Sequence, residues 1–190
     1  MPVSIYAISH KDTGSILSYC VLGDQKVTDV ASATALRDRL VGDKLVISLR
    51  TAASGGFSFL KSDVTVDEIT IDESSQSDFY RDPFAYVLVL PSSSQPGDGK
   101  IKTIGPGGPL SKFQLNAAGT LTVTLPTGLG PPTKLLAVLE GHAPSPITLS
   151  APSSTVDIPL GVSSLTAGHS YAVVFLGQGL PSSVVLLPAV

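Results

Sequence analysis

The segment that decides the fold is Leu165–Phe175, LTAGHSYAVVF, in which a polar corner containing Gly168 leads directly into a string of apolar residues. The run Tyr171–Leu176 is typical of a buried strand that begins at a turn. Six further short apolar or alternating runs lie in the same half of the chain: Phe113–Leu115, Leu121–Leu125, Leu135–Leu139, Ile147–Leu149, Thr155–Ile158 and Val184–Leu187. Gly, Pro, Ser and Asn separate them, and no helical period is visible. Seven such runs in about 80 residues predict an antiparallel β-sandwich.

This segment resembles the corner before strand F of fibronectin type III modules. That family typically has a Leu, then Pro-Gly, then a Tyr whose hydroxyl ties the corner, and then alternating apolar residues. The positions that match in spacing are Leu165, Gly168, Tyr171, Val173 and Phe175. Ala167 stands where the family usually has Pro, and Leu121–Leu125 lacks the family's strand-B Trp. The resemblance implies an immunoglobulin-like sandwich, and an interaction module more readily than a catalyst.

Composition and charge divide the chain near its middle. Residues 91–109 contain four prolines and five glycines, which cannot sustain a helix or a central strand. Residues 1–90 hold 12 acidic and 8 basic side chains, whereas residues 91–190 hold 3 and 4. We therefore expect an α+β domain at 1–90, a Gly/Pro-rich linker at 91–109 and an immunoglobulin-like β-sandwich at 110–190. A functional loop is the alternative interpretation of 91–109.

The first half predicts a small α+β domain with one helix. Val3–Ile8 and Ile16–Leu22 form a predicted β-hairpin, in which Gly14 is free to take a positive φ. Apolar residues recur at helical spacing from Val30 to Val41, and Gly42 is placed to end that helix. The fold class is therefore mainly β, with a small α+β domain followed by the sandwich.

Strands are predicted for most of the remaining first half. Lys44–Arg50, Phe57–Leu60 and Phe84–Leu90 are alternating or continuous apolar runs of strand length. In Val64–Ile71 the apolar residues change from even to odd positions. Because side chains alternate between faces, this change predicts a bulge or turn near Asp67-Glu68.

Composition also excludes several classes of protein. The apolar runs are far shorter than the ~20 residues of a membrane helix, and Met1–His10 does not resemble a secretory leader. A net charge of −3 without a basic arm argues against nucleic-acid binding. The single cysteine, Cys20, cannot form an internal disulfide and is expected to pack as a small hydrophobe.

Asp12-Thr13-Gly14-Ser15 is the one motif with a catalytic namesake, because aspartic proteases carry Asp-Thr-Gly at their paired carboxylates. The chain has no second copy, and His10-Lys11 precede the motif where an apolar strand is usual. We expect a solvated hairpin turn here.

Two further groups of side chains are candidates for cation sites. Seven acidic residues fall within twenty positions: Asp63, Asp67, Glu68, Asp72, Glu73, Asp78 and Asp82. Their spacing fits no EF-hand, so we expect a solvated acidic edge that blocks strand pairing, with a calcium site as the alternative. The histidines His10, His142 and His169 have no partner at zinc-ligand spacing.

No catalytic, cofactor-binding or metal-binding residue can be assigned from the sequence. The chain lacks the Gly-x-Ser-x-Gly nucleophile elbow, and its Gly-Pro-Gly-Gly-Pro run lacks the Lys of a P-loop. We expect a protein that is not an enzyme and needs no cofactor.

The second half has an unusually charge-poor surface. From Phe113 to Val190 only Lys134, Glu140 and Asp157 are charged, and the chain ends on the apolar stretch Val184–Val190. Such a surface is explained if much of it is buried in an assembly. We expect protein partners or a homo-oligomer, in a structural virion component such as a capsid decoration, head-spike or tail protein of a phage-like particle.

The alternative is a carbohydrate-binding or adhesion module of a secreted or cell-surface protein. Surfaces rich in Ser, Thr, Gly and Pro are common outside cells. Sugars stack on exposed aromatic rings, preferably Trp, which this chain lacks. Tyr6, Tyr80 and Tyr86 leave this alternative open.

Overall fold

The structure, a computed structural model, describes residues 3–21, 30–47, 56–71, 73–89, 100–103, 112–125, 133–149, 154–178, 180 and 182–190. The fold is mainly β, as predicted. The chain forms two compact units. The first comprises Met1–Leu45, Phe59–Ile104 and Gly179–Pro181, and the second comprises the rest, including Gly105–Gln178 and Ser182–Val190.

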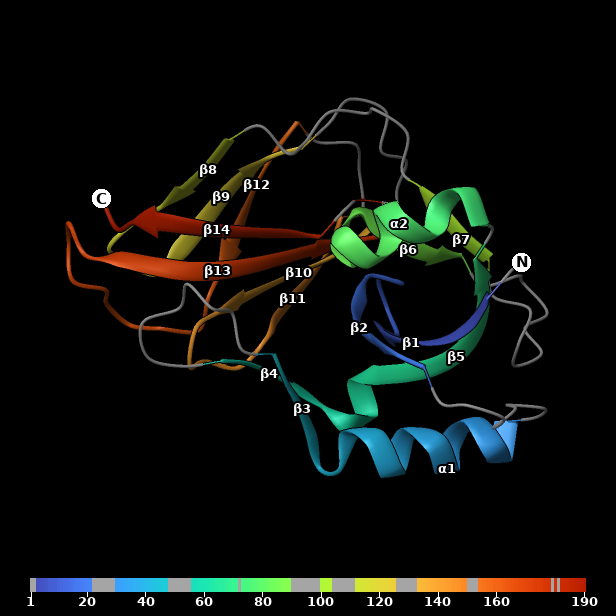
Figure 1. Cartoon of the computed structure of the whole chain (residues 1–190). Helices are drawn as coiled ribbons and strands as arrows, with labels where there is room; N and C mark the ends of the chain where they lie inside the picture. The colour runs from blue at the N-terminus through green and yellow to red at the C-terminus, as the bar shows by residue number, and fades with distance from the viewer. Residues whose placement is uncertain are drawn as a thin grey trace. The chain divides into compact units, whose positions relative to one another are not determined.

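An antiparallel sheet of three strands, in the order β2-β1-β5, is the centre of the first unit (Figure 1). Strand β1 (Val3–His10) and strand β2 (Ile16–Cys20) form the predicted hairpin, and β5 (Val64–Ile71) pairs with the other edge of β1. Gly14 in the turn has a φ of 70°, as its position in the hairpin predicted.

Helix α1 (Val30–Val41) has the predicted bounds, and Gly42 follows it with a φ of 59°. The sequence did not predict the second helix, α2 (Glu73–Arg81). Its one buried residue is Phe79, so it has no apolar stripe that a helical period could reveal. Neither helix of the described chain is long and apolar enough to cross a membrane.

Tertiary contact explains why α2 forms. The Phe79 ring meets the rings of Tyr19 and Tyr86 edge-on, with centroids 5.2 and 5.3 Å apart. Full burial of one such side chain is worth roughly 2–3 kcal/mol. A single anchor of this size, absent from any local pattern, attaches the helix to the sheet.

Strand β5 contains no bulge, so our expectation of one near Asp67-Glu68 was wrong. All eight of its residues pair with β1 in uninterrupted register. Val64 and Val66 face one side of the sheet and Ile69 and Ile71 the other, and all four are buried. The parity of the apolar residues changes because both faces of the sheet are covered.

The cover differs on the two faces. α1 lies against β5 on one side (Figure 1). The other side packs with α2 and β6 in one cluster of buried residues: Ile5, Ala7, Ile16, Ile69, Ile71, Phe79, Tyr86 and Leu88. A register shift does occur in the hairpin, between Ile8 and Ser9 where β1 pairs with β2, and the sequence did not predict it.

Two short strand pairs complete the part of the chain before the sandwich. β3 (Lys44–Ile47) pairs with β4 (Phe57–Leu60), and β6 (Tyr86–Val89) pairs with β7 (Lys100–Thr103). Single 3-10 turns precede β5 and β6. β7 lies inside the segment 91–109 that we expected to link two domains; residues 91–99 and 104–109 lie outside the described residues.

All seven strands predicted for the second half are present, in two antiparallel sheets. One sheet has the order β12-β9-β8, with β8 (Lys112–Leu115), β9 (Thr120–Thr124) and β12 (Thr155–Pro159). The other has the order β11-β10-β13-β14, with β10 (Thr133–Leu139), β11 (Ser145–Leu149), β13 (Ser170–Gly177) and β14 (Ser183–Pro188). The first, second and fifth strands of this half thus form one sheet and the third, fourth, sixth and seventh form the other, which is compatible with a β-sandwich.

The corner before β13 has the hydrogen bond that the resemblance implied. The Tyr171 hydroxyl accepts a hydrogen bond from the Thr166 amide at 3.0 Å. Gly168 takes a φ of 78°, and its amide donates to the Ala189 carbonyl at 2.8 Å. The His169 ring packs edge-on against Tyr171, with centroids 5.0 Å apart. The corner is therefore tied both to itself and to the last strand.

We predict that Tyr171→Phe lowers the unfolding free energy by about 1 kcal/mol, because it removes one hydrogen bond and leaves the ring. Urea unfolding followed by circular dichroism measures the change as a lower midpoint with an unchanged slope. Tyr80→Phe, on the exposed side of α2, is the matched control and should leave the midpoint unchanged. Equal midpoints for Tyr171→Phe and wild type would contradict a stabilising corner.

Candidate functional site

Four polar side chains are buried where β1 turns into β2. The exposed fraction is no more than 6% for each of them: Ser9, His10, Thr13 and Ser15. Buried hydroxyl and imidazole groups lower stability unless they are hydrogen-bonded. This turn is therefore the strongest concentration of buried polar chemistry in the described chain.

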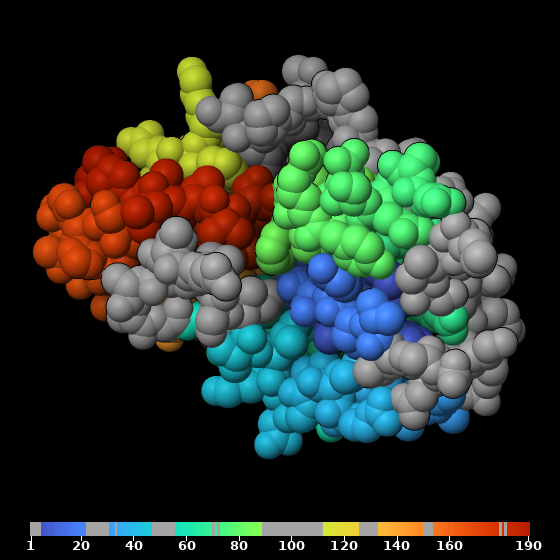
Figure 2. All heavy atoms as spheres, in the orientation of Figure 1, coloured from blue at the N-terminus to red at the C-terminus, as the bar shows by residue number. Residues whose placement is uncertain are grey.

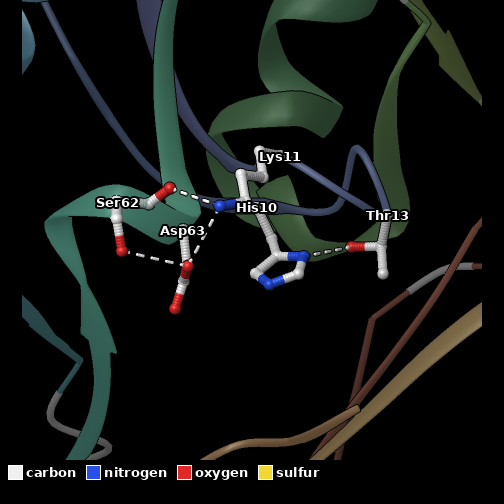
Figure 3. A network of polar contacts seen from close by, with 5 residues as sticks. All are labelled: His10, Lys11, Thr13, Ser62 and Asp63. Atoms are coloured by element: carbon white, nitrogen blue, oxygen red, sulfur yellow. Dashed lines mark hydrogen bonds and ion pairs between the residues drawn. The ribbon is translucent and has the colours of Figure 1, made fainter. Parts of the chain in front are cut away.

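The hydroxyl of Thr13 is the centre of this group. It donates to Ser15 Oγ at 2.9 Å and accepts from the Ser15 amide at 3.3 Å. It also lies 3.3 Å from Nδ1 of His10, the contact drawn in Figure 3. The His10 ring meets Phe59 of β4 edge-on, with centroids 6.2 Å apart. We call His10, Thr13 and Ser15 the turn cluster.

Lys11 ties the outside of the turn to the 3-10 turn before β5 (Figure 3). Its Nζ donates to the Ser62 carbonyl at 2.7 Å and lies 3.2 Å from Oδ1 of Asp63. The two side chains of this ion pair are 43% and 30% exposed, and pairs so exposed contribute at most about 1 kcal/mol. The pair positions the turn more than it stabilises the fold.

The backbone at Gly14 is pressed against β6. The Gly14 carbonyl accepts a hydrogen bond from the Leu88 amide at 2.8 Å. A Cβ on residue 14 would lie 2.6 Å from the Leu88 carbonyl oxygen, which no side chain can tolerate. Both the positive φ and this contact require glycine.

Our expectation of a solvated turn at residues 12–15 was wrong, because contact with β6 buries Thr13 and Ser15. Asp12, the residue that would be catalytic in an aspartic protease, is exposed. The buried groups of the turn are hydroxyls and an imidazole rather than paired carboxylates.

The acidic segment, which we expected to be a solvated edge, is divided among several elements. Glu73 and Asp78 lie on α2, where Asp78 pairs with Arg81 at 3.1 Å. Asp63 pairs with Lys11, and Asp72 lies outside the described residues. Nowhere in the described ranges do three His, Cys, Asp or Glu side chains come together as a metal site.

The remaining candidate ligands are scattered. His142 is exposed and its Nδ1 lies 2.9 Å from the Glu140 carbonyl, whereas His169 packs on Tyr171. Cys20 is half-buried in β2, and burial raises the pKa of its thiol. A raised pKa keeps the thiol protonated and unreactive.

Two of the three tyrosines considered for sugar stacking are buried. Tyr6 and Tyr86 are 2% and 6% exposed. Tyr80 is 38% exposed, and its ring lies 5.6 Å from that of Tyr19. One partly exposed ring pair is the remaining aromatic surface among these residues.

Asp67 is an ionisable side chain in an apolar place. It lies on the same face of β5 as Ile69, opposite Ala7 of β1, and its Oδ2 is buried with no hydrogen-bond partner in the described residues. Burial raises the pKa of this carboxyl, and a hydrogen bond from Thr65 offsets only part of the effect.

A groove runs between the edge strands of the two sheets of the sandwich. It has a volume of about 530 Å³ and is lined by Lys112–Leu115 of β8 and by Leu187, Pro188 and Val190. Lys112 is its only charged residue. An apolar groove beside two strand edges suits an extended peptide segment.

The last strand exposes aliphatic side chains on its outer face. Val184 and Leu186 are 39% and 64% exposed, and Val190 is 63% exposed. Figure 2 shows atoms of this strand, in dark red, on the visible surface. The opposite, inner face of this sheet carries Phe175 of β13. The centroid of its ring lies 5.8 Å from that of Phe113 on β8, in the other sheet.

Sequence reasoning missed both the turn cluster and the groove. The one available signal for the cluster was the hairpin itself, which brings His10 and Ser15 to either side of a four-residue connection. No local sequence pattern predicts the groove, because it forms between β8 and the end of β14, which are far apart in the chain.

We predict that Asp67→Asn raises the unfolding free energy at pH 7 by about 1 kcal/mol, because it removes a charge that burial destabilises and that the hydrogen bond from Thr65 only partly offsets. The pKa of Asp67 is raised in the folded chain. Relative to the variant, wild type is therefore most stable below the pKa that Asp67 has in the unfolded chain. It loses that stability as the pH rises through the pKa of the folded chain. The gain from the variant should therefore vanish near pH 3.5, below the ordinary Asp value.

Urea midpoints at the two pH values measure this difference. Asp43→Asn, at an exposed aspartate, is the control and should show no such pH dependence. A lower midpoint for Asp67→Asn at pH 7 would show that the carboxylate is stabilising.

No family model, curated protein or solved structure matches this chain.

Proposed function

We propose that the protein is a non-enzymatic structural protein that assembles through the edge strand β14 of its sandwich. The observation that supports this is the aliphatic outer face of that strand, where Leu186 is 64% exposed. An exposed leucine alone is ordinary. Here Leu186 and Val184 lie two residues apart on the same exposed face of β14, which is the last strand in its sheet.

Edge strands of soluble proteins usually carry features that prevent pairing with another chain. Charged side chains, inward charges, bulges and prolines are the common ones. Residues 182–190 contain no charged side chain, and Pro188 stands only at the end of the strand. Six consecutive pairs with β13 occupy one side of β14 in regular register. Among the described residues no named strand pairs with its other side, so that side is suited to receive a strand.

A second copy of the chain is the partner that fits best. An uncharged strand can pair antiparallel with its own copy without repulsion between like charges, in a two-fold contact. The neighbouring groove along β8, which Lys112 helps to line, would accept further aliphatic side chains. Larger assemblies can use the same edge.

We further propose that this assembly is a particle, with the protein as a capsid decoration, head-spike or tail component of a phage-like virion. The support is the charge distribution. The second half carries 7 charged residues in 100, and the first half carries 20 in 90. A surface so poor in charge is suited to burial among subunits, whereas the acidic half is suited to solvent.

We predict that the wild-type chain self-associates at micromolar concentration and that Leu186→Lys shifts it to monomer. A lysine on each copy would place like charges opposite one another in the paired strands. Sedimentation velocity across a concentration series, at low and high salt, measures the shift.

Val21→Lys is the matched control, because Val21 is 59% exposed in the first unit and gains the same charge. It should leave the assembly intact. A wild-type chain that stays monomeric at every concentration would overturn the proposal. Glycan binding by such a monomer on an array would favour the carbohydrate-binding alternative.

A further inference from the structure

The peptide bond between Gly14 and Ser15 lies among groups suited to acyl transfer within the chain. The Ser15 hydroxyl belongs to the same residue as the amide nitrogen that would leave. Thr13 Oγ1 is in hydrogen-bond reach of both Ser15 Oγ and Ser15 N, at 2.9 and 3.3 Å. On the other side of the bond, the Leu88 amide donates to the Gly14 carbonyl at 2.8 Å.

We propose that Gly14–Ser15 is a self-cleavage site, at which Ser15 Oγ attacks the carbonyl carbon of Gly14. Nucleophile, proton relay and carbonyl hydrogen bond all come from the chain itself. No part of this inference depends on assembly through β14.

The first step is an N-to-O acyl shift. Rotation of the hydroxyls lets Ser15 Oγ give its proton to Thr13, and Thr13 give its own to Nδ1 of His10. The Oγ–C bond forms, and the negative charge that develops on the Gly14 oxygen is stabilised by the Leu88 amide. The C–N bond then breaks as Ser15 N receives a proton back through Thr13. The product is an ester with the same atoms as the peptide.

The second step consumes one water molecule. Its oxygen adds to the ester carbon, and the C–Oγ bond breaks as Ser15 Oγ takes up a proton. Gly14 then ends in a carboxylate and Ser15 begins with an amine. Neither step involves oxidation or reduction, and neither needs a metal or cofactor.

The burial of the site decides which substrate it can take. Ser15 is 0% exposed, so its hydroxyl cannot reach an acyl group of another molecule. Gly14 has no side chain to shield its carbonyl carbon from Oγ. Burial slows hydrolysis by water, so we expect the ester to accumulate. Hydroxylamine is a much stronger nucleophile than water toward esters and should therefore cleave it faster.

The test is denaturing mass spectrometry of the purified full-length chain, incubated for days at pH 7.5 with and without hydroxylamine. We expect two products, residues 1–14 and 15–190, in wild type, and faster cleavage with hydroxylamine. Ser15→Ala should abolish both. Thr13→Val, which keeps the shape but removes the hydroxyl, should slow cleavage roughly 100-fold or more.

Ser9→Ala is the matched control, because Ser9 is equally buried but bonds to Thr65 instead, at 3.0 Å. It should cleave at the wild-type rate. Ser15→Cys keeps a nucleophile and should cleave on addition of a thiol or hydroxylamine. A single uncleaved mass for wild type and Ser15→Cys under all conditions overturns the proposal, as does equal cleavage of Ser15→Ala.

Discussion

The uninterrupted pairing of β1 with β5 is the constraint on which the first unit depends. Eight consecutive residue pairs leave no freedom of register, so the faces on which side chains lie are fixed along both strands. One face meets α2 and β6, and the other lies toward α1. The same pairing carries β1 to its end at His10, where the chain must turn beneath β6. Contact of this turn with β6 then buries the turn cluster.

The second unit is organised differently, by a corner and an edge. Tyr171 and Gly168 bind backbone groups around the start of β13, and the Gly168 contact reaches the end of the chain at Ala189. The corner therefore holds the residue that follows β14 through backbone hydrogen bonds. β14 pairs along β13, and in the described residues no named strand pairs with its other side between Ser183 and Pro188. An edge that is already ordered loses less conformational entropy on pairing than a flexible one.

Local patterns could predict the strands of the sandwich, α1 and the hairpin, since each has its own period and its own turn residues. They could not predict α2, which depends on the docking of Phe79, or the smooth course of β5, whose parity changes because both faces are covered. The turn cluster was missed for the same reason. Asp12-Thr13-Gly14 looks like any polar turn until Leu88, remote in the sequence, covers it.

Closing a hairpin with a buried network of hydroxyls and imidazole contributes little to the free energy of unfolding. Each of its hydrogen bonds contributes only about 1 kcal/mol, and an exposed turn would avoid the desolvation altogether. Cleavage at Gly14 would change this balance, because the new carboxylate and ammonium carry a desolvation cost that the neutral peptide bond does not. The turn would open away from Leu88, while β1 would stay in the sheet through its pairing with β5 and the full burial of Ile5 and Ala7. Self-cleavage at this site would therefore expose the edge of β6 without releasing the strand before it.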